Sequence, residues 1–540
     1  MKVMVLINEA SKEKLRGGFY TPKDIADFIL KWAINGNKEM DILEPSCGDG
    51  VFLQIMKEKN IPYNSISAVE FDETEYQKAL SIDLENSFIV NDDFHNYCLT
   101  TRDKFDLIIG NPPYIRYQYF SKDQQTLAEK IFRKSGLKYT KLTNAWVSFV
   151  VGSSQLLKEK GKIAFVLPAE LLQVSYAQQL REFLAHFYNK INIVSFEKLV
   201  FPEIQQEVVL LLCEKDGTSS HKIEHLELRN AESLKNLDIL KLKNPQKKID
   251  FKTNKWTFYF LEQDEIDFLE KLQESKRVPK LGKYADVEVG ITTGSNPFFT
   301  VPLATVQFYD LEKYAKPLVG RSVQVLSLIF TEEDWKKNRD IQARTHLLTF
   351  PKMSDLNGSL GARDYLEYGI EEGINKGYKC GIRDEWQIIP SLKISEALFI
   401  RRNHLYPKLI INDAKAYTTD TMHRVSIKKD VNLKAFTASY YNSLSFAFAE
   451  ISGRSHGGGV LELMPSEVEN IFLPYHKSNE TLVETIDNMI RTKESIDRIL
   501  EITNKEILMN NYGFSKEEVD MADRIWKKLS KRRLNRGKNL

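Results

Sequence analysis

The chain has 540 residues, of which 42% are hydrophobic and 28% are charged, and its formal net charge at pH 7 is +2. This length exceeds what one hydrophobic core usually supports, so two or three domains are expected. The small net charge excludes a uniformly basic protein, and any nucleic-acid-binding surface must therefore be local.

The cysteines and the apolar runs indicate the broad class of the protein. Cys47, Cys98, Cys213 and Cys380 lie far apart and form no C-x-x-C pair, which argues against a zinc site or a disulfide framework. We expect no bound metal. No uncharged apolar stretch approaches about 18 residues, and the N-terminus lacks the pattern of a signal peptide. The sequence therefore predicts a cytoplasmic protein without a membrane span.

Short apolar runs alternate with longer amphipathic runs over the first 215 residues. This alternation predicts a mostly parallel sheet wound by helices, which is a Rossmann-like α/β fold. The last two strands have only a short connection, which favours an antiparallel hairpin. The expected strands are 41–44, 65–70, 88–90, 105–110, 162–167, 191–196 and 208–213, and the expected helices are 23–34, 51–59, 74–84, 144–158 and 171–188.

A glycine-rich turn follows the first expected strand. Residues 41–50 read Asp-Ile-Leu-Glu-Pro-Ser-Cys-Gly-Asp-Gly, and the next helix begins directly after Gly50. At the carboxyl end of a first parallel strand such a turn binds a nucleotide-like ligand, because Gly48 and Gly50 let the backbone approach it closely. Leu53 stands where a dinucleotide fingerprint has its third glycine. A ligand without a pyrophosphate, S-adenosylmethionine (SAM), is therefore favoured.

Acidic residues follow the next two strands. Glu70 closes the second strand, where a carboxylate can accept hydrogen bonds from both ribose hydroxyls. Asp93 and Phe94 follow the third strand, and we expect them to hold the adenine amine of SAM and to pack on its ring. Helix capping is the alternative role for either acid. Upstream, Thr21 is expected to cap the first helix.

The tetrapeptide Asn111-Pro112-Pro113-Tyr114 lies at the carboxyl end of the fourth strand. An exocyclic amine conjugated to an aromatic ring is a poor nucleophile, because its lone pair is delocalised into the ring. Two acceptors on its two hydrogens, the Asn111 side-chain oxygen and the Pro112 carbonyl, would localise that lone pair. Consecutive prolines hold the carbonyl in place, and Tyr114 offers a flat face to the base. An ordinary turn is the alternative for this tetrapeptide taken alone.

With these motifs in this order, residues 17 to about 213 resemble the SAM-dependent amino-methyltransferases of DNA, and more narrowly the gamma class of N6-adenine enzymes. The resemblance implies SAM as cofactor, an adenine flipped out of double-stranded DNA as substrate, and a recognition domain after the catalytic one. It implies that Phe201 stacks on the flipped base opposite Tyr114. It also implies SAM contacts from Thr21, Glu44, Gly48, Gly50, Glu70, Asp93 and Phe94, and amine contacts from Asn111 and Pro112.

The rest of the chain is expected to recognise DNA. We expect a catalytic domain at 1–215, a connector at 216–279, a mixed α/β target recognition domain at 280–475 and a helical segment with a basic tail at 476–540. The segments that resemble specificity domains are 287–299, 377–383 with Trp386, and 454–463, with local positive charge from Arg401, Arg402 and Lys408. Their polar side chains on glycine turns suit phosphates and base edges. Residues 527–538 hold seven Lys or Arg and are expected to contact phosphates, with a solvated terminus as the alternative.

Several alternatives remain open at this point. We expect the modification enzyme of a restriction-modification system, active as a monomer and acting beside a separate restriction endonuclease. An N4-cytosine DNA methyltransferase needs the same amine chemistry, and Asn111 favours adenine by resemblance only. Methylation of a protein glutamine or of RNA is a further alternative, although the large C-terminal half argues against the glutamine enzymes. The intact Asn111, Pro112 and Tyr114 argue against a non-catalytic DNA-binding subunit.

Overall fold

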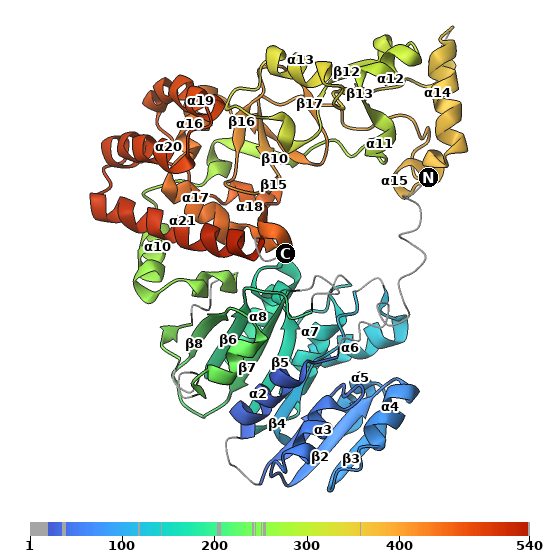
Figure 1. Ribbon diagram of the computed structural model, residues 1–540, viewed down its shortest axis with the longest axis vertical. Helices are drawn as coiled ribbons and strands as arrows, with labels where there is room; N and C mark the ends of the chain where they lie inside the picture. Colours follow the sequence, from blue (N-terminus) through green and yellow to red (C-terminus); the bar gives the residue numbers. More distant parts are fainter. Residues whose placement is uncertain are drawn as a thin grey trace. The chain divides into compact units, whose positions relative to one another are not determined.

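The computed structural model describes residues 20–34, 39–116, 119–141, 143–201, 207–239, 242, 245–249, 251, 255–356 and 358–537. The chain forms two compact units, Met1–Ile266 and Asp267–Leu540. The first unit is built on one large sheet, and the second contains three smaller sheets and a group of helices (Figure 1). The helix α10 (Gln263–Ser275) spans the boundary between them.

Among the described residues, the sheet of the first unit has nine strands in the order β3-β2-β1-β4-β5-β7-β6-β8-β9. The five strands from β3 to β5 are parallel to their neighbours, whereas β7 is antiparallel to both β5 and β6. The Rossmann-like fold and the terminal hairpin are thereby confirmed. The strands are β1 Asp41–Glu44, β2 Ser65–Glu70, β3 Ser87–Asn91, β4 Phe105–Gly110, β5 Leu157–Pro168, β6 Lys190–Phe196 and β7 Val208–Glu214.

Two further strands extend this sheet into the range that was expected to be a connector. β8 (Lys222–Leu228) pairs in parallel with β6 over its whole length, and β9 (Lys247–Lys248) pairs with β8. Ile223 and His225 of β8 are buried, while the other five residues of the strand are only partly covered. β8 covers the edge of the apolar strand β6. The sequence of β8 is polar, so it was not predicted to be a strand. These strands belong to the first compact unit, which ends at Ile266.

Helices cover both faces of the sheet. α2 (Lys23–Ile34) and α3 (Val51–Glu58) pack together and share one core with alternate sheet residues such as Ile42 and Leu107. The sheet residues that alternate with these, on the other face, are buried as well. The helices α5, α6 and α7 contact one another and form the second group of helices. The helices are α4 Glu73–Leu80, α5 Phe94–Thr100, α6 Lys122–Lys134, α7 Ala145–Gln155 and α8 Gln178–Phe187, with 3-10 turns at Ala169–Leu172, Ser175–Ala177, Ala231–Asn236 and Trp256–Phe260.

The sequence did not predict α5 and α6. α6 is mostly polar, and only Ala128, Ile131 and Phe132 of its thirteen residues are buried. α5 has seven residues, and its N-terminus is capped by Asp93. Short helices of this kind depend on their neighbours in the fold, because isolated helices of this length are only marginally stable in water.

The second unit contains sheets of order β10-β18-β14-β16, β11-β13-β12-β17 and β15-β20-β19. Two apolar cores lie in this part, one built around Phe299 and Leu347 and the other around Phe330 and Ile410. Its strands are β10 Ala285–Val289, β11 Thr300–Val301, β12 Ala315–Val319, β13 His346–Leu348, β14 Ala397–Ile400, β15 Arg402–Asn403, β16 Leu409–Ile411, β17 Tyr417–Thr418, β18 Met422–Ile427, β19 Arg454–His456 and β20 Val460–Glu462.

Helices close the second unit. The helical segment expected from residue 476 contains two α-helices, α19 and α20, which are separated by a turn at Lys493, whose φ is +61°. A π-helix, Asn504–Asn511, follows the second of them. The helices are α11 Asn296–Phe299, α12 Leu303–Phe308, α13 Glu332–Asp340, α14 Leu360–Glu371, α15 Tyr378–Gly381, α16 Leu433–Tyr440, α17 Ser443–Ser452, α18 Pro465–Glu469, α19 Val483–Arg491, α20 Ile496–Thr503 and α21 Lys516–Gly537.

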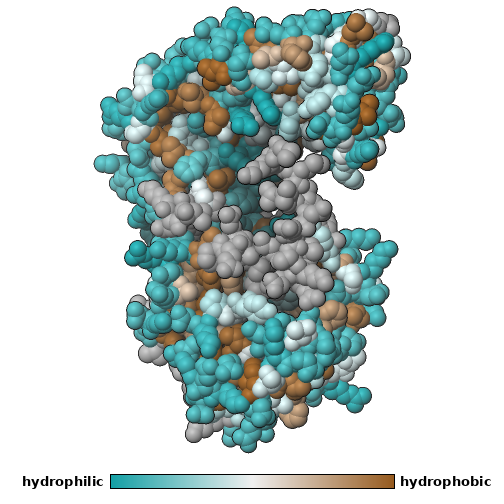
Figure 2. Space-filling model, turned by 45° about the vertical axis from the view of Figure 1, so that its right-hand side comes forward, coloured by the Kyte–Doolittle hydropathy of each residue, from teal (hydrophilic) through white to brown (hydrophobic). Residues whose placement is uncertain are grey.

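The surface seen in Figure 2 is mostly hydrophilic, with hydrophobic residues in scattered patches. Among the described residues, no helix combines the length and the apolar character needed to cross a membrane.

Candidate active site

The parallel strands β1, β2, β3 and β4 bring their carboxyl ends to one edge of the sheet. A cavity of about 580 Å³ lies there, which is within the usual range of small-ligand pockets. Seven of the residues predicted from the sequence line it, namely Thr21, Glu44, Gly48, Glu70, Asp93, Phe94 and Asn111. The other four predicted residues, Gly50, Pro112, Tyr114 and Phe201, are not among its described lining residues.

Gly48 and Gly50 shape the turn between β1 and α3. Their φ angles are +54° and +84°, which residues with side chains rarely adopt. Gly48 lines the cavity, and its N–H donates a hydrogen bond to Glu70. At Gly50, an added Cβ would clash with Ile82 and lie 3.3 Å from the Cα of Ala79. Gly50 therefore supports the site through the backbone conformation and the packing behind the cavity.

The carboxylate of Glu70 is fixed at the wall of the cavity. Its Oε2 accepts the N–H of Gly48 at 2.8 Å, and its Oε1 accepts the N–H of Asp72 at 2.8 Å. Burial raises the pKa of Glu70, and the two backbone N–H groups counteract this only in part. The side chain is thus held in one position at the end of β2. Its contact with a ribose remains a prediction.

Glu44 is the most deeply buried acid of the cavity, with 1% of its surface exposed. Burial raises its pKa well above the usual range, and the negative charges of Glu70 and Asp49 raise it further. Within the described part of the chain, its Oε2 has no hydrogen-bond partner. A buried carboxyl group without a donor is unfavourable, so a ligand with a positive charge and N–H groups would complete this site. SAM carries an ammonium group and a sulfonium and therefore fits these residues.

Asp93 is held on both of its carboxylate oxygens. Oδ1 accepts the backbone N–H of His95 at 2.7 Å and lies 2.8 Å from its Nδ1, while Oδ2 accepts from Gln124 Nε2 at 2.8 Å. Burial by itself would raise the pKa of Asp93, but these partners outweigh it and lower the pKa to about 2. His95 Nε2 lies 2.7 Å from Ser148 Oγ. Asp93 therefore caps α5, and its contact with the adenine amine of a cofactor remains a prediction.

Aromatic side chains form the apolar wall of the cavity. Phe94 is 2% exposed and stacks on Phe149 with ring centroids 4.8 Å apart. Phe120 and Ile115 also line the cavity. Flat apolar surfaces of this kind suit a purine ring. Of these four residues, the sequence indicated only Phe94, because Phe149 belongs to α7 and reaches the cavity through tertiary packing.

The segment before α2 also reaches the cavity. Thr21 is buried and Tyr20 is 52% exposed, and both residues line it. The helix α2 begins at Lys23, as expected, and the carbonyl of Pro22 accepts the N–H of Ile25 and that of Ala26 at 3.0 and 3.1 Å, so Pro22 rather than Thr21 stands directly before the first helical residue. The neighbouring residues 17–19 lie outside the described residues.

Asn111 connects the cofactor side of the cavity with the tetrapeptide after β4. The hydroxyl of Ser46, in the loop after β1, donates to the Asn111 carbonyl at 3.3 Å. Asn111 and Pro113 line the cavity, whereas Pro112 is buried. Asn111 thus lines the same cavity as the residues expected to hold SAM, and the contact of its side chain with an acceptor amine remains a prediction.

Tyr114 and Phe201 pack against the core that contains α2 and α3. The Tyr114 hydroxyl donates to the Val166 carbonyl at 3.2 Å, and burial raises its pKa well above the usual range. Both rings therefore lie against the same apolar cluster, and their stacking on a flipped base remains a prediction. Residues 202–206, which follow Phe201, lie outside the described residues.

In the second unit, the fold joins two of the segments that resemble specificity domains. Arg383 Nη2 donates to the carbonyls of Thr292 and Thr293 at 3.1 and 2.9 Å, and its Nη1 donates to Trp386 at 3.1 Å. Gly294, with φ +92°, packs against Cys380. Segments 287–299 and 377–386 are thus in contact, and the hydrogen bonds of Arg383 connect them.

The basic tail lies on α21, and at least two of its members, Arg533 and Lys527, form ion pairs within the protein. Arg533 is 1% exposed and pairs with Glu450 through two bonds of 3.0 and 2.6 Å. This residue therefore cannot contact phosphates as expected, because packing of α21 on α17 buries it. Lys527 pairs with Asp523 at 2.8 Å.

The described residues contain no group of three or more His, Cys, Asp or Glu side chains that could hold a metal ion. The four cysteines are buried and free.

Comparisons with known proteins match both halves of the chain. Residues 28–201 match the Eco57I restriction-modification methylase family, and residues 253–508 match the C-terminal domain of the type II methyltransferase M.Eco57I. The chain is 25% identical to the type II methyltransferase M.AccI of Acinetobacter calcoaceticus over 470 residues, which are 83% of this chain and 84% of that protein.

Two further matches are weaker, one because it covers a smaller share of the chain and the other because its sequence identity is lower. The type II methyltransferase M.HincII of Haemophilus influenzae is 29% identical over 241 residues, which are 43% of each chain. The solved structure of the type IIG restriction endonuclease BpuSI is 14% identical, with a TM-score of 0.39, and the match covers 95% of this chain and 65% of that one.

Proposed function

We propose that this chain is a restriction-modification DNA methyltransferase that methylates the N6 amine of adenine. The proposal is supported by the match of residues 28–201 to the Eco57I restriction-modification methylase family and of residues 253–508 to the C-terminal domain of M.Eco57I. SAM is the methyl donor. The single observation that carries the proposal is the cavity in which Asn111 meets Glu44, Glu70 and Asp93. The acceptor is an adenine within a short sequence of double-stranded DNA.

Glu44, Glu70, Asp93 and Phe94 would hold SAM at the sheet edge. The buried carboxyl of Glu44 and the fixed carboxylate of Glu70 favour a cationic ligand with hydroxyl and N–H donors. Phe94 offers its ring to the adenine moiety. When bound, SAM supplies an electrophilic methyl group on a sulfonium.

Asn111 and Pro112 act on the acceptor amine. The side-chain oxygen of Asn111 accepts one N–H of the amine and the Pro112 carbonyl accepts the other, so that the lone pair becomes localised on nitrogen. Both acceptors stabilise the positive charge that develops as the methyl group arrives. After transfer, the amine releases one proton to solvent.

The adenine must leave the duplex to reach this site, and unstacking it costs a few kcal/mol. Tyr114 and Phe201 are proposed to offset this cost by stacking on the extruded base. Residues 280–475 are proposed to form the target recognition domain. One catalytic and one recognition half would allow a monomer to act beside a separate restriction endonuclease.

An N4-cytosine methyltransferase is the second candidate, because the same two acceptors serve that amine. Sequencing of modified bases in genomic DNA from cells that express the wild type or Asn111→Ala separates these outcomes. We expect N6-methyladenine in one short motif, absent in the variant and present with Asn488→Ala, which changes an exposed residue of α19. N4-methylcytosine would correct the base, and no mark from a wild type that binds SAM would refute DNA as the substrate.

A further inference from the structure

The small sheet β15-β20-β19 of the second unit gathers charged residues on one face. Glu462, in the central strand β20, is paired with Arg402 of β15 and with Arg454 of β19. Directly paired residues of a sheet project to the same side, so the glutamate lies between two arginines. His456 is two residues beyond Arg454 in β19 and shares this side.

Glu462 organises the basic side chains around it. Its Oε1 lies 3.1 Å from Arg402 Nε and 3.0 Å from the Nε of Arg401, while its Oε2 lies 2.9 Å from His456 Nε2. The glutamate side chain is only 7% exposed. The hydrogen bond from His456 and the charges of both arginines lower its pKa to about 2, against the opposing effect of burial. The carboxylate is therefore charged and holds its partners in fixed positions.

Positive charge exceeds negative charge on this face. Arg454 pairs with Glu467 at 3.3 Å, so three arginines and a histidine share two carboxylates. The side chains of Arg402 and His456 are 68% and 49% exposed. Within the described part of the chain, Arg402 forms hydrogen bonds through its Nε alone. Its two Nη groups can therefore bind a ligand without breaking an internal contact.

The stability of the fold gives little reason for this arrangement. An exposed ion pair contributes about 0–1 kcal/mol, and Glu462 already has partners in Arg401 and His456. A guanidinium fixed at Nε, with both Nη groups accessible, suits bidentate binding of a phosphate. This face is thus better suited to binding an anion than to stabilising the fold.

We propose that the face formed by Arg401, Arg402, Arg454 and His456 around Glu462 binds the phosphate backbone of the DNA substrate. This inference rests on the proposed function, because it takes DNA as the ligand. Contacts of this kind position a duplex without reading its sequence. The basic pair Arg401-Arg402 and the segment 454–463, which are far apart in the sequence, would then act as one site.

Neighbouring residues keep the sheet in place. The turn between β19 and β20 contains Gly458 and Gly459, with φ angles of +76° and +74°. Arg533 of α21 donates to the carbonyls of Gly459 and His404. The helix α21 thereby holds the turn beside His456 in place, close to the groups proposed to bind phosphate.

The test compares Arg402→Gln with Arg498→Gln. Arg498 is a matched control, because it is 57% exposed and pairs with Glu501 in the same unit. Fluorescence anisotropy with SAM present measures binding to two duplexes, one with and one without the methylated motif, at several salt concentrations. For Arg402→Gln we expect a loss of about tenfold on both duplexes and a slope of log K against log salt that is smaller by about 1. Arg498→Gln should match the wild type in both.

A second variant, Arg402→Lys, keeps the charge and loses the bidentate geometry. We expect it to keep the salt slope of the wild type while its affinity falls about threefold. Wild-type values for Arg402→Gln would overturn the inference and leave the proposed function standing. A loss confined to the duplex with the motif would assign base reading instead, which also overturns it. Failure of the wild type to bind any duplex would refute the proposed function, and the inference with it.

Discussion

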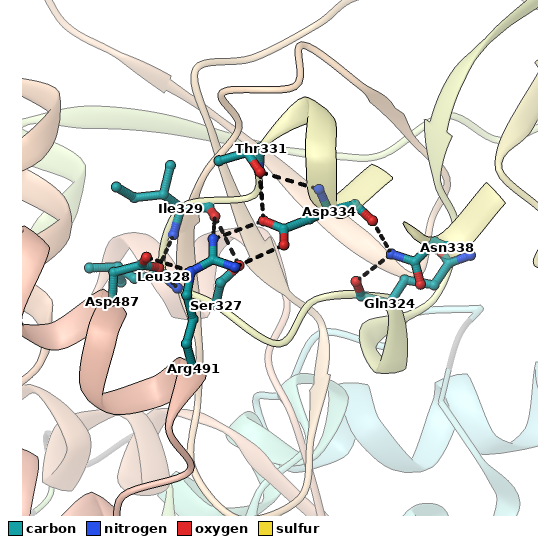
Figure 3. A network of polar contacts seen from close by, with 9 residues as sticks. All are labelled: Gln324, Ser327, Leu328, Ile329, Thr331, Asp334, Asn338, Asp487 and Arg491. Carbon is teal, nitrogen blue, oxygen red and sulfur yellow. Dashed lines mark hydrogen bonds and ion pairs between the residues drawn. The ribbon is translucent and has the colours of Figure 1, made fainter. Parts of the chain in front are cut away.

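Arg491 of α19 forms a bidentate ion pair with Asp334 of α13, with Nη1–Oδ1 and Nη2–Oδ2 distances of 2.8 and 2.9 Å (Figure 3). The same guanidinium donates to Asp487 at 2.7 Å and to the Ile329 carbonyl at 2.8 Å. Asp487 in turn accepts the N–H groups of Leu328 and Ile329. One arginine therefore joins α19 to α13 and to the segment before α13.

Arg491→Ala should lower the free energy of unfolding of the second unit by about 2 kcal/mol. The change leaves the largely covered carboxylates of Asp334 and Asp487 without their charged donor. Urea denaturation followed by circular dichroism measures the effect. The control Arg498→Ala removes an exposed pair and should cost about 0.5 kcal/mol or less. If both variants lose the same free energy of unfolding, the network around Arg491 contributes no more to stability than an exposed ion pair.

The same network predicts a dependence of stability on pH. Burial alone would raise the pKa of Asp334, but hydrogen bonds from Arg491 and Thr331 lower it to about 2. An acid with a lowered pKa stabilises the fold above its unfolded pKa of about 4, and this stability is lost as pH falls toward 2. The difference in urea midpoint between wild type and Arg491→Ala should therefore shrink from pH 5 to pH 2.5. A constant difference would contradict this origin of the low pKa.

Gly50→Ala should destabilise the first unit by about 2–4 kcal/mol and weaken SAM binding. The substitution combines a left-handed backbone with a Cβ that would displace the end of the Ile82 side chain and lie 3.3 Å from the Cα of Ala79. Gly48→Ala is the comparison, because a Cβ there meets nothing within 4 Å and only the backbone strain of about 1–2 kcal/mol applies. Urea denaturation and calorimetric titration with SAM test both variants. A larger effect on stability at Gly48 would contradict the packing argument.

Glu44→Gln should stabilise the ligand-free protein and weaken SAM binding about tenfold. Burial, together with Glu70 and Asp49, raises the pKa of Glu44. An acid with a raised pKa supports the fold while protonated, so the stability of the ligand-free wild type falls as pH rises from about 4.5 through the folded pKa. The variant should lack this decrease. Melting temperatures between pH 5 and pH 9, with and without SAM, measure it.

The control for this prediction is Glu159→Gln, which changes an exposed acid of β5. It should leave both the pH profile and the SAM affinity at wild-type values. If Glu44→Gln binds SAM as tightly as the wild type, Glu44 does not contact the cofactor.

The sequence alone was sufficient for the seven strands from β1 to β7 and for seven of the residues that line the cavity. Strand-end motifs such as Gly48, Glu70, Asp93 and Asn111 could be read because parallel strands must end at the same edge of a sheet. Local patterns decide these elements, since each strand carries its own apolar run.

Tertiary structure decided what the local patterns could not. β8 is a strand because β6 offers it an edge, and the polar α6 places Gln124 on Asp93 only after folding. The buried pairing of Arg533 with Glu450 likewise depends on α21 packing against α17. The face around Glu462 combines residues about 50 positions apart in the sequence through cross-strand pairing. Such contacts have no periodicity to read, because the partner of each residue is set by the register of strands and by the packing of helices.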